Sequence, residues 1–331
     1  ALPIWKGREM AARIKLADIA REAGVSVTTV SFYINGKARQ YKLSRQTCER
    51  IQAAIDRNDF VPNIFARALQ CNRTYLIGLL VRGRINTSFW SDIVAGLEEK
   101  LAPAGFHLVL SSAHTDAAGE LEALREMRRI EVDAYVVSPA LDEHGNCVNF
   151  EELQKLNGTT PVVVMNSPAE GLTCVYNDES AGGRAAAEYI ASTGAERIMI
   201  FEDHVGCNFG RIIAFREFFA ERGTVVEEVD SPEPVIAAAK QMKVGVFCFS
   251  DFLAASLCCR ALAEGVRIGE ELAVVGYDDL AFLDLLSPRP ATVTQCKYEL
   301  GEAIGEELLR ILEQGEPDTA RKIVFTPKLH R

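Results

Sequence analysis

The sequence has few of the features that mark catalytic, metal-binding or membrane proteins. It contains no GxxxxGK[ST], HExxH or GxSxG motif, and its five histidines show no ligand spacing. The nine cysteines are scattered without a CxxC pair, so we expect free, buried thiols in a reducing cytoplasm. No apolar run approaches the ~20 residues of a membrane span. These absences argue against catalytic residues, a cofactor, a metal site and a membrane partner.

Positive charge is also scarce, but it is unevenly distributed. The 331 residues include 36 Lys and Arg against 46 Asp and Glu, a net charge of −10. Residues 1–70 nevertheless carry twelve basic and six acidic residues, which leaves a net charge of −16 on the remaining 261 residues. Such asymmetry is typical of a basic module attached to an acidic body. Because a basic module can neutralise phosphates, we predict that the N-terminal part contacts DNA.

Residues 16–36 have the pattern of a helix-turn-helix. A short helix is predicted to end at Gly24, and a three-residue connection leads to a second helix that starts at Thr28. Two helices joined through a turn with glycine form a motif whose second helix fits the major groove of B-DNA. An ordinary helical hairpin has the same spacing and remains the alternative at this point.

Two further helices are predicted before the chain changes character. Ser44 is predicted to cap a third helix that completes an apolar core, after the polar, basic loop GKARQYK. Asn63 can cap an eight-residue helix, which is too short to be stable alone in water. It would order against a partner helix or DNA, or be a plain linker. The predicted segments are an N-terminal extension (1–12), an all-α helix-turn-helix domain (13–61) and a hinge helix (62–73).

From Tyr75 onward, apolar strands alternate with amphipathic helices. Continuously apolar strands separated by helices indicate parallel sheets that are covered on both faces. The pattern fits either one barrel or two doubly wound lobes. The predicted strands are YLIGLLV, FHLVL, AYVVS, PVVVM, RIMIF, VGVFCF and LAVVGY.

Polar and aromatic side chains follow these strands, at the edge where ligands bind in open α/β sheets. Together they offer aromatic rings, a guanidinium group, carboxylates and amide or hydroxyl groups, which suits a small polyhydroxylated ligand. Plain alternatives remain, such as a helix N-cap for Asp251, core packing for Phe89 and a surface charge for Arg211. The candidates are Phe89, Trp90, Ser138, Asn166, Arg211, Asp251 and Asp278.

At this point the chain resembles the lactose-repressor/purine-repressor (LacI/GalR) family, over Lys15–Arg331. The motifs that carry the resemblance are the helix-turn-helix, VPN-x4-AL (Val61–Leu69), Asn177-Asp178-Glu179 and VVGYDDL (Val274–Leu280). The resemblance implies a body like a periplasmic sugar-binding protein, with two lobes and a three-part crossover. The implied core is 74–331, with an N-lobe of about 74–173 and 294–316 and a C-lobe of about 174–293 and 317–331.

The resemblance also implies DNA contacts. Val27 and Thr28 would meet base edges, whereas Leu69 would wedge a base step in the minor groove while two hinge helices pair. Phe32 stands where many members have Arg, so its ring could instead meet a thymine methyl group or pack inward. The basic loop could add phosphate contacts or be solvated. The expected DNA-binding residues are Val27, Thr28, Thr29, Ser31, Phe32, Tyr33, Asn35, Lys37, Arg39, Asn63, Arg67 and Leu69.

In the core, the resemblance matches Arg211 to a ligand-gripping arginine, Asp278 to a hydroxyl-binding acid and Phe89-Trp90 to a stacking pair. It adds Gln295 to the pocket, beside Asn166 and Asp251. Asn166 stands where many members have Asp, and Ala214 where Gly is usual. The expected effector therefore stays open among a sugar, a sugar phosphate and a sugar acid.

Together these features predict a bacterial, cytoplasmic and nucleoid-associated regulator. We expect a homodimer that represses carbohydrate-utilisation genes from a pseudo-palindromic operator. A solute-binding protein for sugar uptake is one alternative, but it is expected to carry an export signal and no basic helical module. A carbohydrate-processing enzyme is the other, since Asp278 and Asp279 could in principle perform acid–base chemistry.

Overall fold

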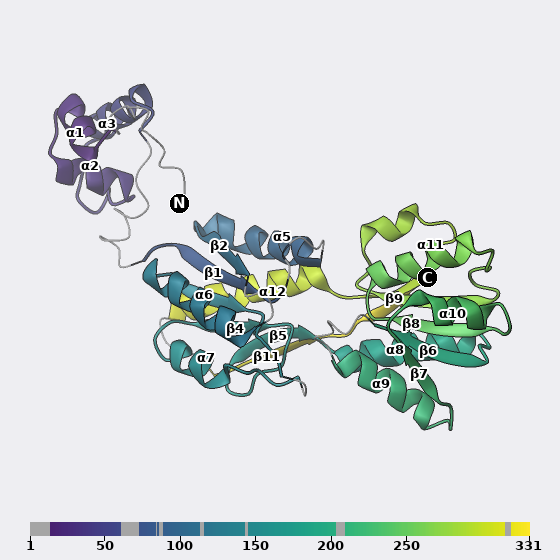
Figure 1. Cartoon of the computed structure of the whole chain (residues 1–331). Helices are drawn as coiled ribbons and strands as arrows, with labels where there is room; N and C mark the ends of the chain where they lie inside the picture. The colour runs from purple at the N-terminus through teal and green to yellow at the C-terminus, as the bar shows by residue number, and fades with distance from the viewer. Residues whose placement is uncertain are drawn as a thin grey trace, which may run out of the picture. The chain divides into compact units, whose positions relative to one another are not determined.

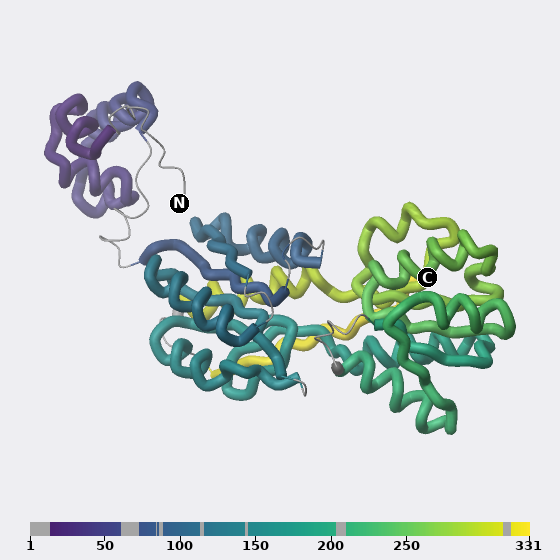
Figure 2. Tube along the Cα trace, in the orientation of Figure 1, coloured from purple at the N-terminus to yellow at the C-terminus, as the bar shows by residue number. Residues whose placement is uncertain are grey.

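A computed structural model describes residues 14–60, 73–83, 85, 89–112, 116–142, 145–202, 209–314 and 319–331. The chain divides into two compact units, residues 1–75 and residues 76–331, which can be followed by colour in Figure 1 and Figure 2. Two predicted segments, the extension (1–12) and nearly all of the hinge helix with Asn63, Arg67 and Leu69, lie outside the described residues. No helix within the described ranges is long and apolar enough to cross a bilayer.

The first unit contains the predicted three-helix arrangement. The first helix ends because Gly24 adopts the left-handed conformation, with φ 65° and ψ 41°. Ser26 and Ser44 cap the next two helices, since each side chain accepts a hydrogen bond from the backbone N–H three residues ahead. The second helix begins one residue earlier than predicted. The helices are α1 (Leu16–Ala23), α2 (Val27–Ile34) and α3 (Arg45–Arg57).

A small apolar core holds these helices together. Ile19, Val30 and Ile51 contribute one fully buried side chain from each helix. Ala20 and Ala23 are buried beside them, and their small size lets α1 approach its neighbours closely. The helical part of the fold prediction is thereby confirmed.

The second unit contains two six-stranded sheets, each covered by helices (Figure 1). The first sheet has the order β11-β5-β4-β3-β1-β2 and is parallel throughout. Its strands are β1 (Leu76–Val81), β2 (His107–Ser112), β3 (Ala134–Val137), β4 (Val162–Met165), β5 (Thr173–Asn177) and β11 (Lys322–Phe325). Its helices are α5 (Phe89–Leu101), α6 (Ala117–Arg129), α7 (Phe150–Asn157) and α12 (Lys297–Gln314), with the short η1 (Ala102–Ala104) after α5.

The second sheet has the order β12-β10-β9-β8-β6-β7, and only β12 runs antiparallel to its neighbour. Its strands are β6 (Arg197–Phe201), β7 (Val226–Val229), β8 (Val244–Cys248), β9 (Leu272–Tyr277), β10 (Ala291–Thr294) and β12 (Lys328–His330). Its helices are α8 (Glu179–Ser192), α9 (Phe209–Ala220), α10 (Pro232–Ala239) and α11 (Asp251–Ala263), with η2 (Ala281–Leu285). Two doubly wound lobes, not one barrel, are therefore the architecture.

The lobe boundaries differ from the predicted ones. The strands β5 and β11 pair with each other in the first sheet, where Cys174 lies opposite Lys322. The prediction ended the N-lobe at residue 173 and gave 317–331 wholly to the C-lobe. Both strands mix polar with apolar residues, so the sequence pattern did not reveal them. The chain crosses from one lobe to the other three times, after Asn177, Thr294 and Phe325.

Candidate functional site

The first candidate site is the exposed side of α2. A surface hollow of about 330 Å³ lies there, with no carboxylate among its lining residues. Val27 and Thr28 are exposed at the start of the helix, where residues can reach base edges. The hollow is lined by Leu16, Val27, Thr28, Ser31, Phe32, Asn35 and Lys37, six of which belong to the predicted DNA-binding set.

Two other members of that set make contacts within the unit. The hydroxyl groups of Thr29 and Ser26 form a hydrogen bond of 2.8 Å at the start of α2. The hydroxyl group of Tyr33 donates to Oε1 of Gln52 on α3, at 2.8 Å. The Tyr33 contact therefore holds α2 against α3, whereas the Thr29 contact stays within the first turn of α2. The predicted contact of both residues with phosphates stays a prediction.

The basic side chains of this unit fall into two groups. Arg21, Arg45 and Arg57 form ion pairs with carboxylates of α1 and α3. Lys37 and Arg39, in the loop after α2, form no ion pair with any residue that the structure describes. Their positive charge is available to an external anion such as a phosphate.

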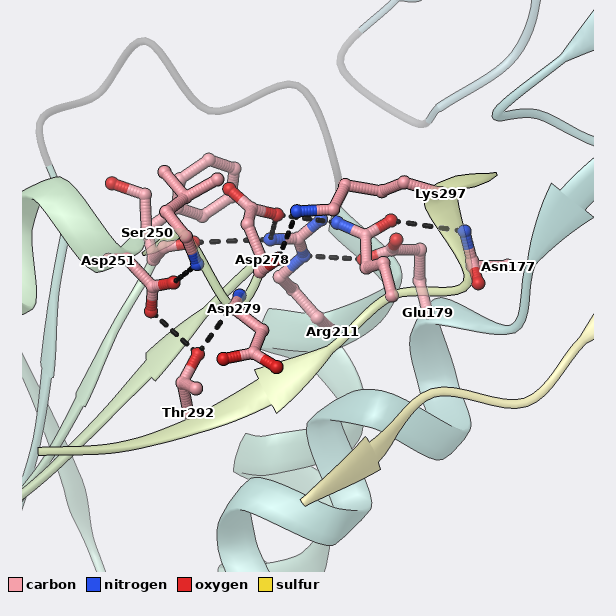
Figure 3. A network of polar contacts seen from close by, with 12 residues as sticks. Asn177, Glu179, Arg211, Ser250, Asp251, Asp278, Asp279, Thr292 and Lys297 are labelled. Atoms are coloured by element: carbon pink, nitrogen blue, oxygen red, sulfur yellow. Dashed lines mark hydrogen bonds and ion pairs between the residues drawn. The ribbon is translucent and has the colours of Figure 1, made fainter. Parts of the chain in front are cut away.

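The second candidate site is a buried polar network at the carboxyl ends of the second sheet's strands (Figure 3). Arg211 on α9 is 4% exposed, and its Nε donates to Glu179 at the start of α8. Its Nη1 donates to the carbonyl oxygen of Phe249 at 3.1 Å and lies 3.9 Å from Oδ1 of Asp278. Its guanidinium carbon lies 3.5 Å from the centre of the Tyr277 ring. Arg211 is thus a buried residue between two carboxylates and not a surface charge.

Asp278 follows β9 with a backbone φ of 104°, a value that residues other than glycine rarely adopt. Its carboxylate accepts a hydrogen bond from Nε2 of Gln295, and its carbonyl oxygen accepts one from Nζ of Lys297 at 2.7 Å. Burial raises the pKa of Asp278 to about 6, although the nearby Arg211 acts in the opposite direction. The carboxylate can therefore change its charge near neutral pH.

The network also reaches the first lobe. Nδ2 of Asn177, the last residue of β5, donates to Oε1 of Gln295 at 3.2 Å. Nζ of Lys297 lies 3.4 Å from Oδ2 of Asp92 on α5. Since Gln295 and Lys297 also contact Asp278, these two residues connect the carboxyl edges of both sheets.

Asp251 lies beside this network as the first residue of α11, and Ser250, not Asp251, is the N-cap of that helix. The side chain of Asp251 is fully buried, and its two oxygens accept hydrogen bonds from the N–H of Leu280 (2.7 Å) and the hydroxyl group of Thr292 (2.6 Å). Burial raises its pKa to about 7. Because protein donors satisfy both oxygens, Asp251 fixes the loop that carries Asp278.

The remaining predicted residues lie at the carboxyl edge of the first sheet. Phe89 and Trp90 open α5 with their rings 5.0 Å apart in an edge-to-face arrangement. Ser138 follows β3 and is 1% exposed, and Asn166 follows β4 with a left-handed φ of 58°. Parallel strands place these four residues on one edge, as the strand-end pattern predicted.

Several members of the network were not predicted as site residues, among them Glu179, Lys297 and Tyr277. Glu179 was visible in the sequence as part of the Asn177-Asp178-Glu179 motif, and Tyr277 as a neighbour of Asp278. Lys297 gave no signal, because its partners come from distant parts of the chain. Among the described residues, no group of three His, Cys, Asp or Glu side chains could hold a metal ion.

Comparisons with known proteins identify the domain types of both units. The family model described as "Bacterial regulatory proteins, lacI family" matches residues 15–63. Two models, "Periplasmic binding proteins and sugar binding domain of LacI family" and "Periplasmic binding protein-like domain", match residues 74–207 and 187–331. Together they cover both units.

Two relatives match nearly the whole chain. The HTH-type transcriptional repressor PurR of Photobacterium profundum is 31% identical over 312 residues, which are 89% of this chain and 90% of the relative. The HTH-type transcriptional regulator DegA of Bacillus subtilis is 25% identical over 325 residues, 94% of this chain and 95% of the relative.

Solved structures share the fold at lower identity. The lac repressor dimer bound to operator and the anti-inducer ONPF superposes with a TM-score of 0.83 and 19% identity, covering 96% of this chain and 98% of that one. A complex of the transcriptional regulator CelR with cellobiose gives a TM-score of 0.65 and 24% identity, covering 96% and 99%.

Proposed function

Because the chain belongs to the lacI family of bacterial transcriptional regulators, we propose that it represses its target genes as a homodimer under the control of a carbohydrate-like effector. Family membership makes it a DNA-binding regulator and not an enzyme. The pseudo-palindromic operator, the dimer, the effector class and a cytoplasmic, nucleoid-associated location are the proposed part.

One observation carries the effector proposal: the buried network that contains Arg211, Glu179 and Asp278 is connected to both lobes. Arg211 and Asp278 offer donors and acceptors suited to ligand hydroxyl groups, in a water-poor environment where such bonds are strong. Lys297 contacts both Asp278 and Asp92 of the first lobe. A ligand that replaces part of this network therefore changes contacts between the lobes.

We assign the other pocket residues by their positions. The Phe89-Trp90 pair would stack on the apolar face of a sugar ring, and Ser138, Asn166 and Gln295 would contact its hydroxyl groups. Solved relatives of the fold hold cellobiose and D-xylulofuranose, which supports a carbohydrate. Asp251 would position the Asp278 loop without touching the effector.

The DNA-binding side of the proposal uses α2 and the loop after it. Val27 and Thr28 would read base edges, and Lys37 and Arg39 would bind phosphates. Ser31 and Asn35 would contact the backbone from the same hollow. Thr29 and Tyr33 would act mainly by orienting α2. In the hinge segment, Leu69 would enter the minor groove with Asn63 and Arg67 beside it.

Control of DNA binding requires only that the effector prefers one arrangement of the lobes. A coupling free energy of ~1–3 kcal/mol between two sites is typical and changes operator affinity by about 5–150-fold. Whether the effector strengthens or weakens operator binding depends on which arrangement of the lobes lets the two hinge segments of a dimer pair. We propose that binding of the effector releases the repressor from its operator.

The experiment is a thermal-shift screen of the full chain with sugars, sugar phosphates, sugar acids and nucleobases, because a ligand that binds the native state raises the melting temperature. Each ligand that does so is then tested for its effect on the affinity for a selected operator duplex. A carbohydrate that raises the melting temperature and weakens operator binding supports the proposal. A nucleobase as the effective ligand, or no change in operator affinity with any binder, rejects carbohydrate control.

A matched pair of variants locates the effector. Asp278→Asn removes a buried acceptor of the network and should lower effector affinity at least about tenfold, or ~1.4 kcal/mol. Asp284→Asn makes the same change at an acid that is 71% exposed on η2 and should leave effector affinity unchanged. Equal effects of the two substitutions would place the effector elsewhere.

A further inference from the structure

The side chain of Phe32 does not pack into the core of the three-helix unit. That core is formed by other residues, with Tyr33 and Ile34 of the same helix packed against it. The Phe32 ring instead stacks on Tyr41, with the ring centres 3.5 Å apart and only 2° between the planes. Tyr41 is 46% exposed, so the stacked pair lies at the surface.

Backbone hydrogen bonds hold the loop of Tyr41 in register with α2. The N–H of Lys37 donates to the carbonyl oxygen of Phe32 at 2.9 Å, and the N–H of Tyr41 donates to that of Lys37 at 3.1 Å. A further bond of 2.9 Å joins the N–H of Leu43 to the carbonyl oxygen of Ala38. The backbone that carries Tyr41 is therefore held close to α2 by these hydrogen bonds, and the stacking on Phe32 places its ring.

Phe32 also forms part of the hollow on α2. Its apolar surface comes from Leu16, Val27 and Phe32, and its hydroxyl and amide groups come from Thr28, Ser31 and Asn35. Lys37 also lines the hollow, and its positive charge favours a polyanion. In the major groove, thymine is the base that presents an apolar group, its C5-methyl. The chemistry of the hollow matches that edge.

We infer that Phe32 reads thymine by enclosing the 5-methyl group of one base in this hollow. Tyr41 is a positioning residue that holds the Phe32 ring in place, which reduces the entropy lost when the base is bound. The inference rests on the proposed function, because it requires α2 to lie in the major groove. It gives the recognition helix a sequence preference that an arginine at the same position would not have.

The test uses the full chain and a duplex selected from a random pool by its binding. Each thymine of that duplex is replaced in turn by deoxyuridine, which removes the 5-methyl group and keeps the base pair. At one thymine position of each half-site, the replacement should weaken binding about fourfold, which corresponds to the ~0.8 kcal/mol of one buried CH₂ group. If no thymine shows this effect in the parent chain, the inference is wrong.

The variants then assign the effect to the stacked pair. Phe32→Ala should bind the thymine and deoxyuridine duplexes equally at that position, whereas Tyr41→Phe should keep the fourfold difference and Tyr41→Ala should reduce it. Arg39→Ala should weaken binding to both duplexes by the same factor, because phosphate contacts carry no base information. A Phe32→Ala variant that retains the fourfold methyl effect would overturn the assignment.

Failure of this inference can be told from failure of the proposed function. If the chain binds no duplex in a salt-sensitive manner, the proposed DNA contact of α2 itself fails. If it selects a sequence with salt-sensitive affinity but Phe32→Ala leaves the methyl effect unchanged, only thymine reading by Phe32 is rejected.

Discussion

The two units place their charged groups in opposite environments. In the three-helix unit, the side chain of Arg45 is 93% exposed although it is paired with Glu49. In the α/β core, the side chain of Arg211 is 5% exposed between Glu179 and Asp278. Exposed pairs are screened by water and salt and contribute little to stability, whereas a buried charge is costly unless its partners remain. The first environment suits exchangeable contacts with phosphates, and the second suits a fixed ligand geometry.

This difference predicts how each unit responds to solution conditions. Contacts of exposed basic residues with DNA weaken as salt concentration rises. Buried carboxylates whose pKa values lie near neutrality respond to pH. Salt should therefore act mainly on DNA binding, and pH mainly on the stability of the core and on the affinity of the core for its ligand.

The largest expected difference comes from removing one arginine in each environment. Arg211→Ala leaves two carboxylates buried without their cation and should lower the free energy of unfolding of the core by about 3–5 kcal/mol. Arg45→Ala should change it by less than about 1 kcal/mol. Urea unfolding of both variants measures the contrast. Similar losses would show that burial does not distinguish the two arginines.

The pH response of the core is the next largest effect. Burial raises the pKa of Asp251 from 3.8 to about 7, so its favourable contribution is complete below about pH 4 and is lost as pH rises toward 7. The free energy of unfolding of the parent, relative to Asp251→Asn, should fall by up to about 1.4 kcal/mol per pH unit between pH 4 and 7. Urea unfolding at several pH values measures this difference, and a constant difference would contradict the raised pKa.

The ligand should show a smaller pH effect through Asp278. If its carboxylate accepts ligand hydroxyl groups, protonation below its pKa of about 6 removes that acceptor. Effector affinity should then be about tenfold weaker at pH 5 than at pH 8. Calorimetric titration with an effector found by the screen measures the profile. The same profile in Asp278→Asn would assign the dependence to another group.

The smallest effect concerns a single exposed charge. Arg39→Ala should reduce the steepness of the salt dependence of operator binding by about two units, one for each protomer of the proposed dimer, and leave the preferred sequence unchanged. Its affinity for the effector should equal that of the parent. A changed sequence preference would show that Arg39 contacts a base and not a phosphate.

The comparison also explains which features the sequence could predict. The boundaries of α1 and α3 depended on local signals such as Gly24 and Ser44, whose effects act within one turn. Six of the seven predicted strands are largely buried, whereas β2 was predicted from its apolar run although it is a partly exposed edge strand. Strands such as β7 and β11 were missed because these short edge strands contain charged residues and carry no long apolar run.

The residues of the candidate ligand site were brought together by the sequence pattern only in part. Arg211 and Asp278 follow strands, so parallel-sheet geometry places them at one edge. Lys297 became visible only in the structure, because its contacts with Asp92 and Asp278 depend on how the crossovers bring distant segments together. Long-range arrangement of this kind leaves no local pattern in the sequence.

Equilibrium binding of the full chain to its selected operator, measured from about 50 to 200 mM salt with and without an effector from the thermal-shift screen, tests the central claim most directly. The logarithm of the affinity should fall linearly with the logarithm of the salt concentration, and the effector should lower affinity about 5–150-fold at each concentration. Binding that is insensitive to salt, or to every ligand that stabilises the core, would contradict a DNA-binding unit governed by a ligand-binding one.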